Sequence, residues 1–277
     1  MTLLADPRAD AFAFFRDFVF TRSAIVLSDE KRYLVETRLG PVAQKAGLAD
    51  LNALAEAVRR GDRALATAVV DAMTTNETSW FRDSTPFEAL RERVLPERIA
   101  ANRERRQLSI WSAACSTGQE PYSIAMLIEQ SFPELATWNV SLLGTDLSSA
   151  ALERARVGRY SNLEINRGLP AANLLQYFTR DGAQFQIAER LRARVRFQPI
   201  NLAEPWPIIA AQDVILLRNV LIYFDAPTKQ KILANVRAHL RPGGYLLLGA
   251  AETTRELVGG FVPVPVARST VYRLEES

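Results

Sequence analysis

The chain has 277 residues, more than the roughly 100–200 of a typical domain, so it holds either one large domain or two unequal ones. Its hydrophobic content of 48% excludes an intrinsically disordered protein. Because no stretch of about 18 uninterrupted apolar residues occurs, the sequence predicts no membrane insertion. The formal net charge of +3 is too small to indicate a nucleic-acid partner.

Targeting and metal-binding signals are weak. The segment Met1–Asp10 carries charged residues and lacks the apolar core of a signal peptide, which predicts a cytoplasmic protein. The single cysteine, Cys115, excludes an internal disulfide and a multi-cysteine metal site. The single histidine, His239, excludes a histidine-rich cluster and weakens any Ser/His/Asp site, so no metal is expected. Nothing indicates an obligate oligomer, and a monomer is expected.

The first part of the chain has a helical pattern. Phe14, Phe15 and Phe18 recur at helical spacing within residues 10–73, and no strand pattern interrupts them. The expected N-caps are Ser28, Asp50 and Asp62, and the expected helix ends are Gly40, Gly47 and Gly61. Residues 1–73 are therefore predicted to form an all-helical N-terminal domain, followed by a linker and connecting helix over 74–106.

From about Gln107 the pattern changes to strands that alternate with helices. The predicted strands are Leu108–Ala114, Val140–Gly144, Val214–Leu217, Tyr245–Ala250 and Thr270–Leu274, and the predicted helices are Pro121–Gln130, Ser148–Arg156 and Pro227–Leu240. This alternation predicts an α/β domain with a doubly wound parallel sheet over 107–277. Its ligand is expected beyond the carboxyl ends of the strands.

One interval breaks this rhythm. About 60 residues separate the helix near Leu152 from the strand near Val214, far more than a usual connection. Within it, four apolar residues from Leu191 to Phe197 alternate with four arginines from Arg190 to Arg196. A period of two describes a strand with one apolar and one basic face. We therefore predict a small strand-rich insertion at about 157–200.

The segment Ser112–Ser123 follows a strand and opens a helix, where this fold places its cofactor loop. It has one glycine, Gly118, and lacks the series of glycines that usually cradles a pyrophosphate. S-adenosylmethionine therefore suits the loop better than NAD. An ordinary strand-to-helix turn is the alternative.

Polar residues follow two further strands. Asp146 can accept hydrogen bonds from both ribose hydroxyls, or it can cap the next helix, a task that Ser148 could perform instead. In Leu217–Asp225, Asn219 can bind a ligand and Tyr223 can present a hydroxyl, unless the aromatic ring packs in the core. Upstream, Thr74–Asp83 is unusually polar for a plain linker.

Five blocks together carry a specific resemblance. They are Thr74–Asp83, Ala113–Ser123, Gly144–Ser148, Arg218–Asp225 and Arg241–Glu252. In order and roughly in spacing they resemble the signature blocks of the chemotaxis-receptor glutamate methyltransferase (CheR) family, over nearly the whole chain. The resemblance implies a class I S-adenosylmethionine methyltransferase domain with an inserted β-subdomain, preceded by an all-helical domain.

The resemblance also implies roles for single residues. Arg82 would contact the cofactor's carboxylate, Glu120 its amino group and Asp146 its ribose. Asn201 and Leu202 would border the adenine. The other implied cofactor contacts are Asn76, Thr78, Asn219 and Val220. Tyr223 would lie near the transferred methyl group, and Arg98 is the candidate for a second basic residue beside the substrate.

The implied reaction transfers a methyl group from S-adenosylmethionine to glutamate carboxylates of a chemoreceptor's cytoplasmic helical bundle, leaving S-adenosylhomocysteine. A carboxylate is already a nucleophile, so no general base is needed. Arginines of the insertion or of the N-terminal helices (Arg22, Arg32 and Arg38) could steer so acidic a partner. The turn Thr179–Phe185 is shorter than in family members that clamp a receptor's C-terminal peptide tether, so tether binding is not expected. A small-molecule methyltransferase and a non-catalytic sensor of S-adenosylmethionine or S-adenosylhomocysteine remain alternatives.

Overall fold

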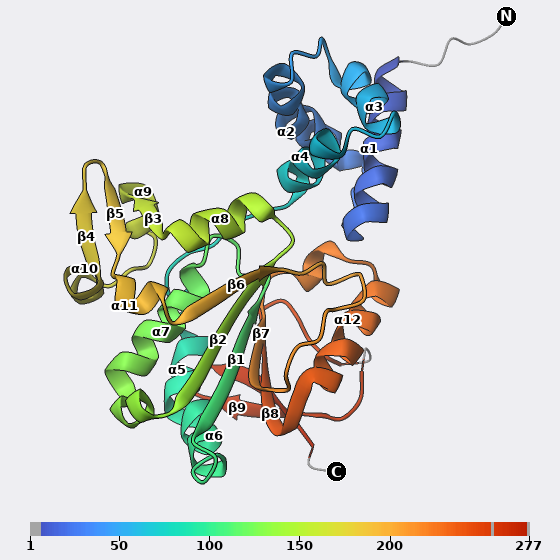
Figure 1. Ribbon diagram of the computed structural model, residues 1–277. Coiled ribbons are helices and arrows are strands. Elements are labelled where there is room, and N and C mark those ends of the chain that lie inside the picture. Colours follow the sequence, from blue (N-terminus) through green and yellow to red (C-terminus); the bar gives the residue numbers. More distant parts are fainter. Residues whose placement is uncertain (1–6, 256–257, 276–277) are drawn as a thin grey trace, which may run out of the picture. The chain divides into compact units, whose positions relative to one another are not determined.

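The computed structural model describes residues 7–255 and 258–275 (Figure 1). They group into two compact units. One contains the chain up to Thr75 together with Tyr223–Thr228, and the other contains Asn76–Ile222 together with Lys229 onward. Among the described residues, each helix is too short or too polar to cross a lipid bilayer.

The first unit is helical. Its elements are α1 (Pro7–Ser23), the 3₁₀ turn η1 (Asp29–Lys31), α2 (Arg32–Lys45), α3 (Leu51–Arg59) and α4 (Arg63–Met73). Their apolar faces meet in one core around the buried residues Phe15, Leu39 and Leu54. This confirms the predicted all-helical domain. Residues 1–6 of the segment Met1–Asp10 lie outside the described part of the chain.

Local signals placed most of these helix ends. The Asp50 carboxylate accepts a hydrogen bond from Ala53 N–H at 2.8 Å and caps α3, and Asp62 caps α4 in the same way. Gly47 follows α2 with a φ of +70°, a conformation that glycine adopts without strain. The expected helix end at Gly40 is wrong, because α2 runs through Gly40 and Pro41 to Lys45.

The second unit begins with connecting helices and continues into the main sheet. The helices are α5 (Thr85–Ala89), the π-helical turn η2 (Leu90–Val94) and α6 (Leu95–Ala101). The strands are β1 (Gln107–Ala113), β2 (Asn139–Asp146), β6 (Val195–Pro199), β7 (Gln212–Leu217), β8 (Leu240–Leu248), β9 (Phe261–Val266) and β10 (Ser269–Leu274). Their spatial order in the described chain is β6-β2-β1-β7-β8-β10-β9.

The strands from β6 to β8 run parallel, whereas β10 and β9 are antiparallel additions at one edge. The segments that connect the parallel strands contain α7 (Gln119–Ser131), the 3₁₀ turns η3 (Pro133–Thr137) and η4 (Leu221–Tyr223), α8 (Ser149–Val157) and α12 (Ala226–His239). Strand β7 is buried along its whole length, as expected for a central strand covered on both faces. The doubly wound α/β prediction is confirmed.

The predicted insertion forms a separate sheet (Figure 1). It contains β3 (Arg159–Ser161), β4 (Phe178–Asp181) and β5 (Gln184–Ile187), paired antiparallel in the order β3-β5-β4. The short helices α9 (Asn162–Ile165), α10 (Ala171–Tyr177) and α11 (Glu189–Arg192) accompany these strands.

The arginine-rich strand predicted between Arg190 and Phe197 is wrong in its first half. Residues Glu189–Arg192 form α11, and only Val195–Pro199 extend, as β6, which pairs with β2 in the main sheet. Ala193, predicted to share the apolar face, is exposed, whereas Leu191 and Val195 are buried. Leu191 lies in α11 and Val195 begins β6, so the alternation runs across the end of a short helix and the start of a strand and does not describe one continuous strand.

Candidate cofactor site

The carboxyl ends of three neighbouring parallel strands bring the predicted site residues to one edge of the sheet. Ala113 at the end of β1 pairs with Thr145 of β2 and with Leu217 of β7. The segments that follow these strands therefore start side by side. This is the edge at which an open α/β sheet binds its ligand.

The loop after β1 has an unusual backbone. Ala114, Ser116 and Gly118 have φ values of +59°, +52° and +92°. The first two are strained there, at a typical cost of roughly 1–3 kcal/mol each, and such strain persists only where the surroundings enforce it. A Cβ on Gly118 would lie 2.9 Å from the Cβ of Ala155, so glycine also permits close packing of the loop against α8. The ordinary-turn alternative does not account for this strain.

Asp146 joins this loop to the end of β2. One of its carboxylate oxygens accepts from Ser116 N–H at 2.8 Å, and the other accepts from Ser148 N–H at 2.9 Å. The side chain of Ser148, not that of Asp146, caps α8 by accepting from Ala151 N–H. The capping alternative for Asp146 is therefore taken by Ser148.

Glu120 lies in the first turn of α7. One carboxylate oxygen accepts from the Ser112 hydroxyl at 2.7 Å, and the other pairs with the Arg218 guanidinium at 2.7 Å. The Glu120 side chain is 12% exposed and that of Arg218 only 2%. The carboxylate thus faces the same edge of the sheet as Asp146.

Arg218 is a residue that the sequence reasoning missed as part of the site. Its Nη2 donates to the carbonyl of Arg82 at 2.9 Å and to the Asp83 carboxylate at 2.8 Å. Its Nε is buried without a hydrogen-bond partner in the described structure. The available signal was a charged residue directly after the fully apolar end of β7, a position where a buried charge needs partners.

Glu252 is a second missed residue. One carboxylate oxygen accepts from the N–H groups of Val220 and Leu221, and the other accepts from those of Asn219 and Gly249, all at 2.7–2.9 Å. Asn219 has a φ of +57°. Glu252 therefore fixes the backbone of the predicted Asn219–Val220 contact, and nothing in sequence spacing connects the two loops.

The linker from Asn76 to Asp83 runs over the same edge. Its Asn76 carbonyl accepts from the Ser116 hydroxyl at 2.8 Å, and Phe81 N–H donates to the Ser123 hydroxyl at 3.1 Å. Thr78 is partly exposed, and the Arg82 side chain donates to the carbonyl of Glu77. The structure thus brings the linker to the β1 loop and to α7.

Asn201 and Leu202 follow β6 beside Asp146, because Ile200 N–H donates to the Asp146 carbonyl at 3.1 Å. Leu202 is 6% exposed, and the Asn201 side chain accepts from Ala203 N–H. Leu202 offers an apolar surface and Asn201 an amide beside the Asp146 carboxylate, a combination that suits the base and the ribose of a nucleoside.

Arg98 is not part of this site, which corrects the sequence prediction. It lies on α6, buried to 6% exposure, and donates to the Gly243 carbonyl at 2.6 Å. Asp213, whose carboxylate lies 3.7 Å from the Arg98 guanidinium, is the second residue of β7, so Arg98 lies at the amino end of the sheet. Burial lowers the pKa of Arg98, and the negative charge of Asp213 opposes that shift. The two side chains thus form a buried ion pair with a structural role.

Tyr223 ends the turn η4, four residues after Asn219. Its carbonyl accepts from Val26 N–H at 2.9 Å, and both residues belong to the first unit. Cys115 is buried in the β1 loop, and burial followed by the charge of Asp146 raises the pKa of its thiol. Because the thiolate is the nucleophile, Cys115 packs rather than reacts.

The residues present fit S-adenosylmethionine better than a dinucleotide. Glu120 and Asp146 are carboxylates at the edge where a pyrophosphate would need hydrogen-bond donors or cations. The same carboxylates suit an ammonium group and ribose hydroxyls.

Comparison with known proteins agrees with this geometry. Residues 76–268 match the family model described as CheR methyltransferase, SAM binding domain, and residues 10–74 match CheR methyltransferase, all-alpha domain. Chemotaxis protein methyltransferase 1 of Pseudomonas aeruginosa is 41% identical over 95% of this chain and 97% of its own length. Chemotaxis protein methyltransferase of Vibrio parahaemolyticus is 43% identical over 94% of this chain and 95% of its own. The chain therefore belongs to the CheR family of S-adenosylmethionine-binding methyltransferases, as the five sequence blocks predicted.

Proposed function

We propose that this protein methylates glutamate side chains on the cytoplasmic helices of chemoreceptors, which gives glutamate methyl esters and S-adenosylhomocysteine. The relatives are named chemotaxis protein methyltransferases, which supports a signalling protein as the substrate. A cytoplasmic location follows from this proposal, because the methylated helices lie there. The chemistry of the site supports a reaction that needs no base.

The chain's own residues would bind the cofactor as follows. Glu120, held by Ser112 and Arg218, would accept hydrogen bonds from the ammonium group of the cofactor's methionine part, and Arg82 would pair with that part's carboxylate. Asp146 would accept from the ribose hydroxyls while Ser116 and Ser148 keep its carboxylate oriented. Asn76, Thr78, Asn201, Leu202, Asn219 and Val220 would complete the walls.

When bound, S-adenosylmethionine supplies a methyl group on a sulfonium, and a glutamate carboxylate oxygen accepts that carbon as the carbon–sulfur bond breaks. The protein would contribute alignment and exclusion of water. His239 is no candidate for a base, because it is the last residue of α12 and directly precedes β8, at the amino end of the sheet. Its ring packs 5.2 Å from that of Trp206. Tyr223 would orient the acceptor through its hydroxyl.

The steering role of the arginine row needs revision in view of the contacts. Arg190 pairs with Glu129, and Arg192 pairs with Glu189. Arg194 and Arg196 are exposed and make no ion pair with another described residue. They are the better candidates to attract an acidic receptor bundle, through faster encounter at low salt. The hairpin β4–β5 has four residues in each strand, which supports a tether-independent enzyme.

The observation that carries the proposal is that two carboxylates, those of Glu120 and Asp146, are held in fixed orientations at the same edge of the sheet, in a domain that belongs to this family. The test is transfer of radiolabelled methyl from S-adenosylmethionine to receptor-rich membranes, with alkaline release of methanol to identify an ester. Cofactor binding without transfer would instead indicate the sensor alternative. Radiolabel in a small molecule, with none in the receptor band, would indicate a small-molecule methyltransferase.

A further inference from the structure

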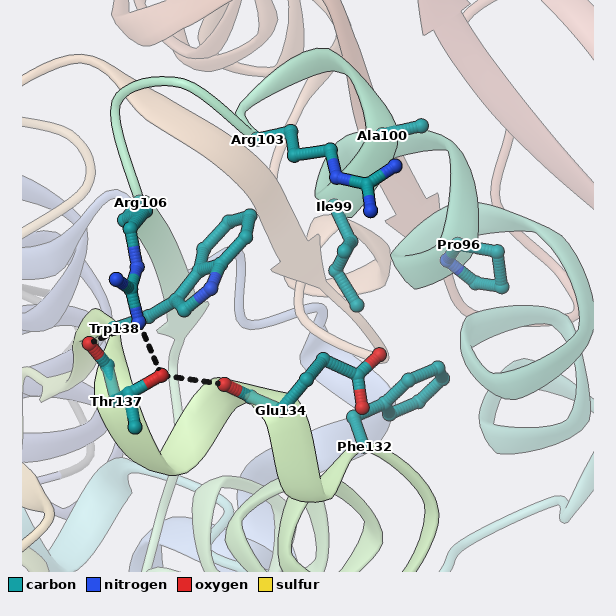
Figure 2. Close-up of a pocket in the computed structure, with 9 residues that line it drawn as sticks. All are labelled: Pro96, Ile99, Ala100, Arg103, Arg106, Phe132, Glu134, Thr137 and Trp138. Carbon is teal, nitrogen blue, oxygen red and sulfur yellow. Dashed lines mark hydrogen bonds between the residues drawn. The ribbon is translucent and has the colours of Figure 1, made fainter.

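A groove lies between α6 and η3 in the second unit (Figure 2). Its volume is about 700 Å³. It is lined by Pro96, Ile99, Ala100, Arg103, Arg106, Phe132, Glu134, Thr137 and Trp138. We call it the α6–η3 groove.

The α6–η3 groove is at the amino end of the sheet, away from the candidate cofactor site. Arg106 and Trp138 directly precede β1 and β2, whose first residues pair with each other. A strand of seven residues separates this end from the carboxyl edge by roughly 20 Å. An occupant of the groove would leave the cofactor site open.

The floor of the groove is apolar and aromatic. Phe132 is buried, while Ile99 and Trp138 are partly buried and pack against the main core. Pro96 and Ala100 are exposed on the same side of α6. Figure 2 shows Ile99 pointing from α6 toward Glu134 and Phe132, with the indole of Trp138 on the side of η3.

The walls of the groove are held in place before anything binds. The Arg106 guanidinium donates to both the carbonyl and the hydroxyl of Thr137, and the Arg106 carbonyl accepts from Asn139 N–H at 2.9 Å. These bonds connect the turn after α6 to η3. A preformed groove loses less conformational entropy on binding than a flexible one.

One arginine that lines the groove, Arg103, makes no side-chain hydrogen bond or ion pair with another described residue. Arg91 pairs with Glu92, Arg93 pairs with Glu97 and Arg105 donates to Asn102. The side chain of Arg103 has no such partner among the described residues, although it lies beside Ile99 (Figure 2). Arg98 of the same segment is buried against Asp213. The remaining stretch 103–106, beside the groove, holds three arginines and one glutamate, an excess of positive charge that favours an acidic group.

We infer that the α6–η3 groove binds an acidic segment of a partner protein. A bulky apolar side chain of the partner would fill the space between Ile99 and Trp138, and a carboxylate would pair with Arg103. Tryptophan and arginine around an apolar centre form the composition typical of binding hot spots. Glu134 lies on the η3 side and would repel a carboxylate there, which fixes the direction in which the segment binds.

The probe is a fluorescein-labelled peptide, acetyl-Glu-Asp-Leu-Phe-Glu-Asp-amide, and the measurement is its anisotropy with the full chain. Two matched peptides change one property each: one replaces the acids by Gln and Asn, and the other replaces Leu-Phe by Ala-Ala. Saturable binding of the first peptide is expected, and at least about tenfold weaker binding of both matched peptides.

Two protein variants locate the binding. Arg103→Glu should weaken binding of the acidic apolar peptide by about tenfold or more, and Trp138→Ala should do the same. Arg91→Glu is the control, because it makes the same charge change in the same segment but does not line the groove. Circular dichroism and unchanged methyl transfer would show that Arg103→Glu is folded.

Equal weakening by Arg91→Glu and Arg103→Glu would overturn the inference, because it would indicate attraction by net charge alone. Binding of oligothymidylate in preference to the peptide would also overturn it, as would no saturation by about 1 mM peptide. Methyl transfer by the same preparations tests the proposed function separately, since the groove is remote from the cofactor edge.

Discussion

The guanidinium of Arg218 pairs with Glu120 at 2.7 Å and with Asp83 at 2.8 Å, and so connects the end of β7 to α7 and to the linker. The Arg218 side chain is 2% exposed, whereas Asp83 is 42% exposed. The pair with Glu120 is therefore the buried one. Its loss would leave a carboxylate with one fewer partner beside the proposed ammonium position.

Arg218→Met is expected to destabilise the second unit by about 3 kcal/mol, because it removes one partner of a buried ion pair. It should also weaken binding of S-adenosylmethionine, since Glu120 would lose its orientation. Urea unfolding and isothermal titration measure the two effects. Asp83→Asn is the matched control and should alter stability by less than about 1 kcal/mol, because its side chain is 42% exposed and water screens its charge. Equal effects of the two variants would contradict this account.

Gly118→Ala should weaken cofactor binding more than Gly61→Ala does. The two glycines have nearly equal φ values, +92° and +94°, so both substitutions introduce similar backbone strain. A Cβ at Gly118 would approach the Cβ of Ala155 to 2.9 Å, whereas a Cβ at Gly61 would have open space within 4 Å, apart from its neighbours in the chain. Titration with S-adenosylhomocysteine gives the cofactor affinity of each variant. Because the backbone strain is similar in both, a greater loss of affinity in Gly118→Ala would be due to the close packing of the loop against α8. Similar affinities in both variants would show that the close packing is unimportant.

Tyr223→Phe should lower the rate of methyl transfer while leaving cofactor affinity nearly unchanged. The substitution removes only the hydroxyl proposed to orient the acceptor. Transfer rates at saturating cofactor and titration without receptor give the two quantities. A large loss of affinity would mean that Tyr223 binds the cofactor rather than orienting the acceptor.

The Cys115 thiol should resist alkylation in the folded protein at pH 8 and react readily in urea, because burial raises its pKa and blocks access. The raised pKa also gives a stability effect with a defined sign. Above the pKa of the unfolded thiol, the unfolded chain binds fewer protons than the folded one, so stability falls as pH rises. Unfolding of Cys115→Ala measured between pH 8 and pH 10 should show a smaller decline than the parent protein. An identical decline would remove Cys115 as its source.

The sequence predicted the parts of this fold that have a local signature. Asp50 and Asp62 cap their helices, and the loop at Gly118 follows a strand, because both patterns lie within a few residues. Arg218 and Glu252 were missed because their partners, Glu120 and the Asn219 turn, are distant in sequence. Arg98 was misplaced because it lies outside the five blocks that carry the resemblance, and nothing in the local sequence tells which end of the sheet its helix reaches. Strand β9 was missed because it contains two prolines, which resemble a loop.

Those prolines have a consequence for the behaviour of the protein at high concentration. Strand β9 is the last strand at its edge of the sheet, and Pro263 and Pro265 carry no N–H to donate to another chain. The opposite edge, β6, carries the exposed charge of Arg196, flanked by Arg194. Both edges therefore oppose growth of the sheet by strand addition, which protects the domain from aggregation through its sheet edges.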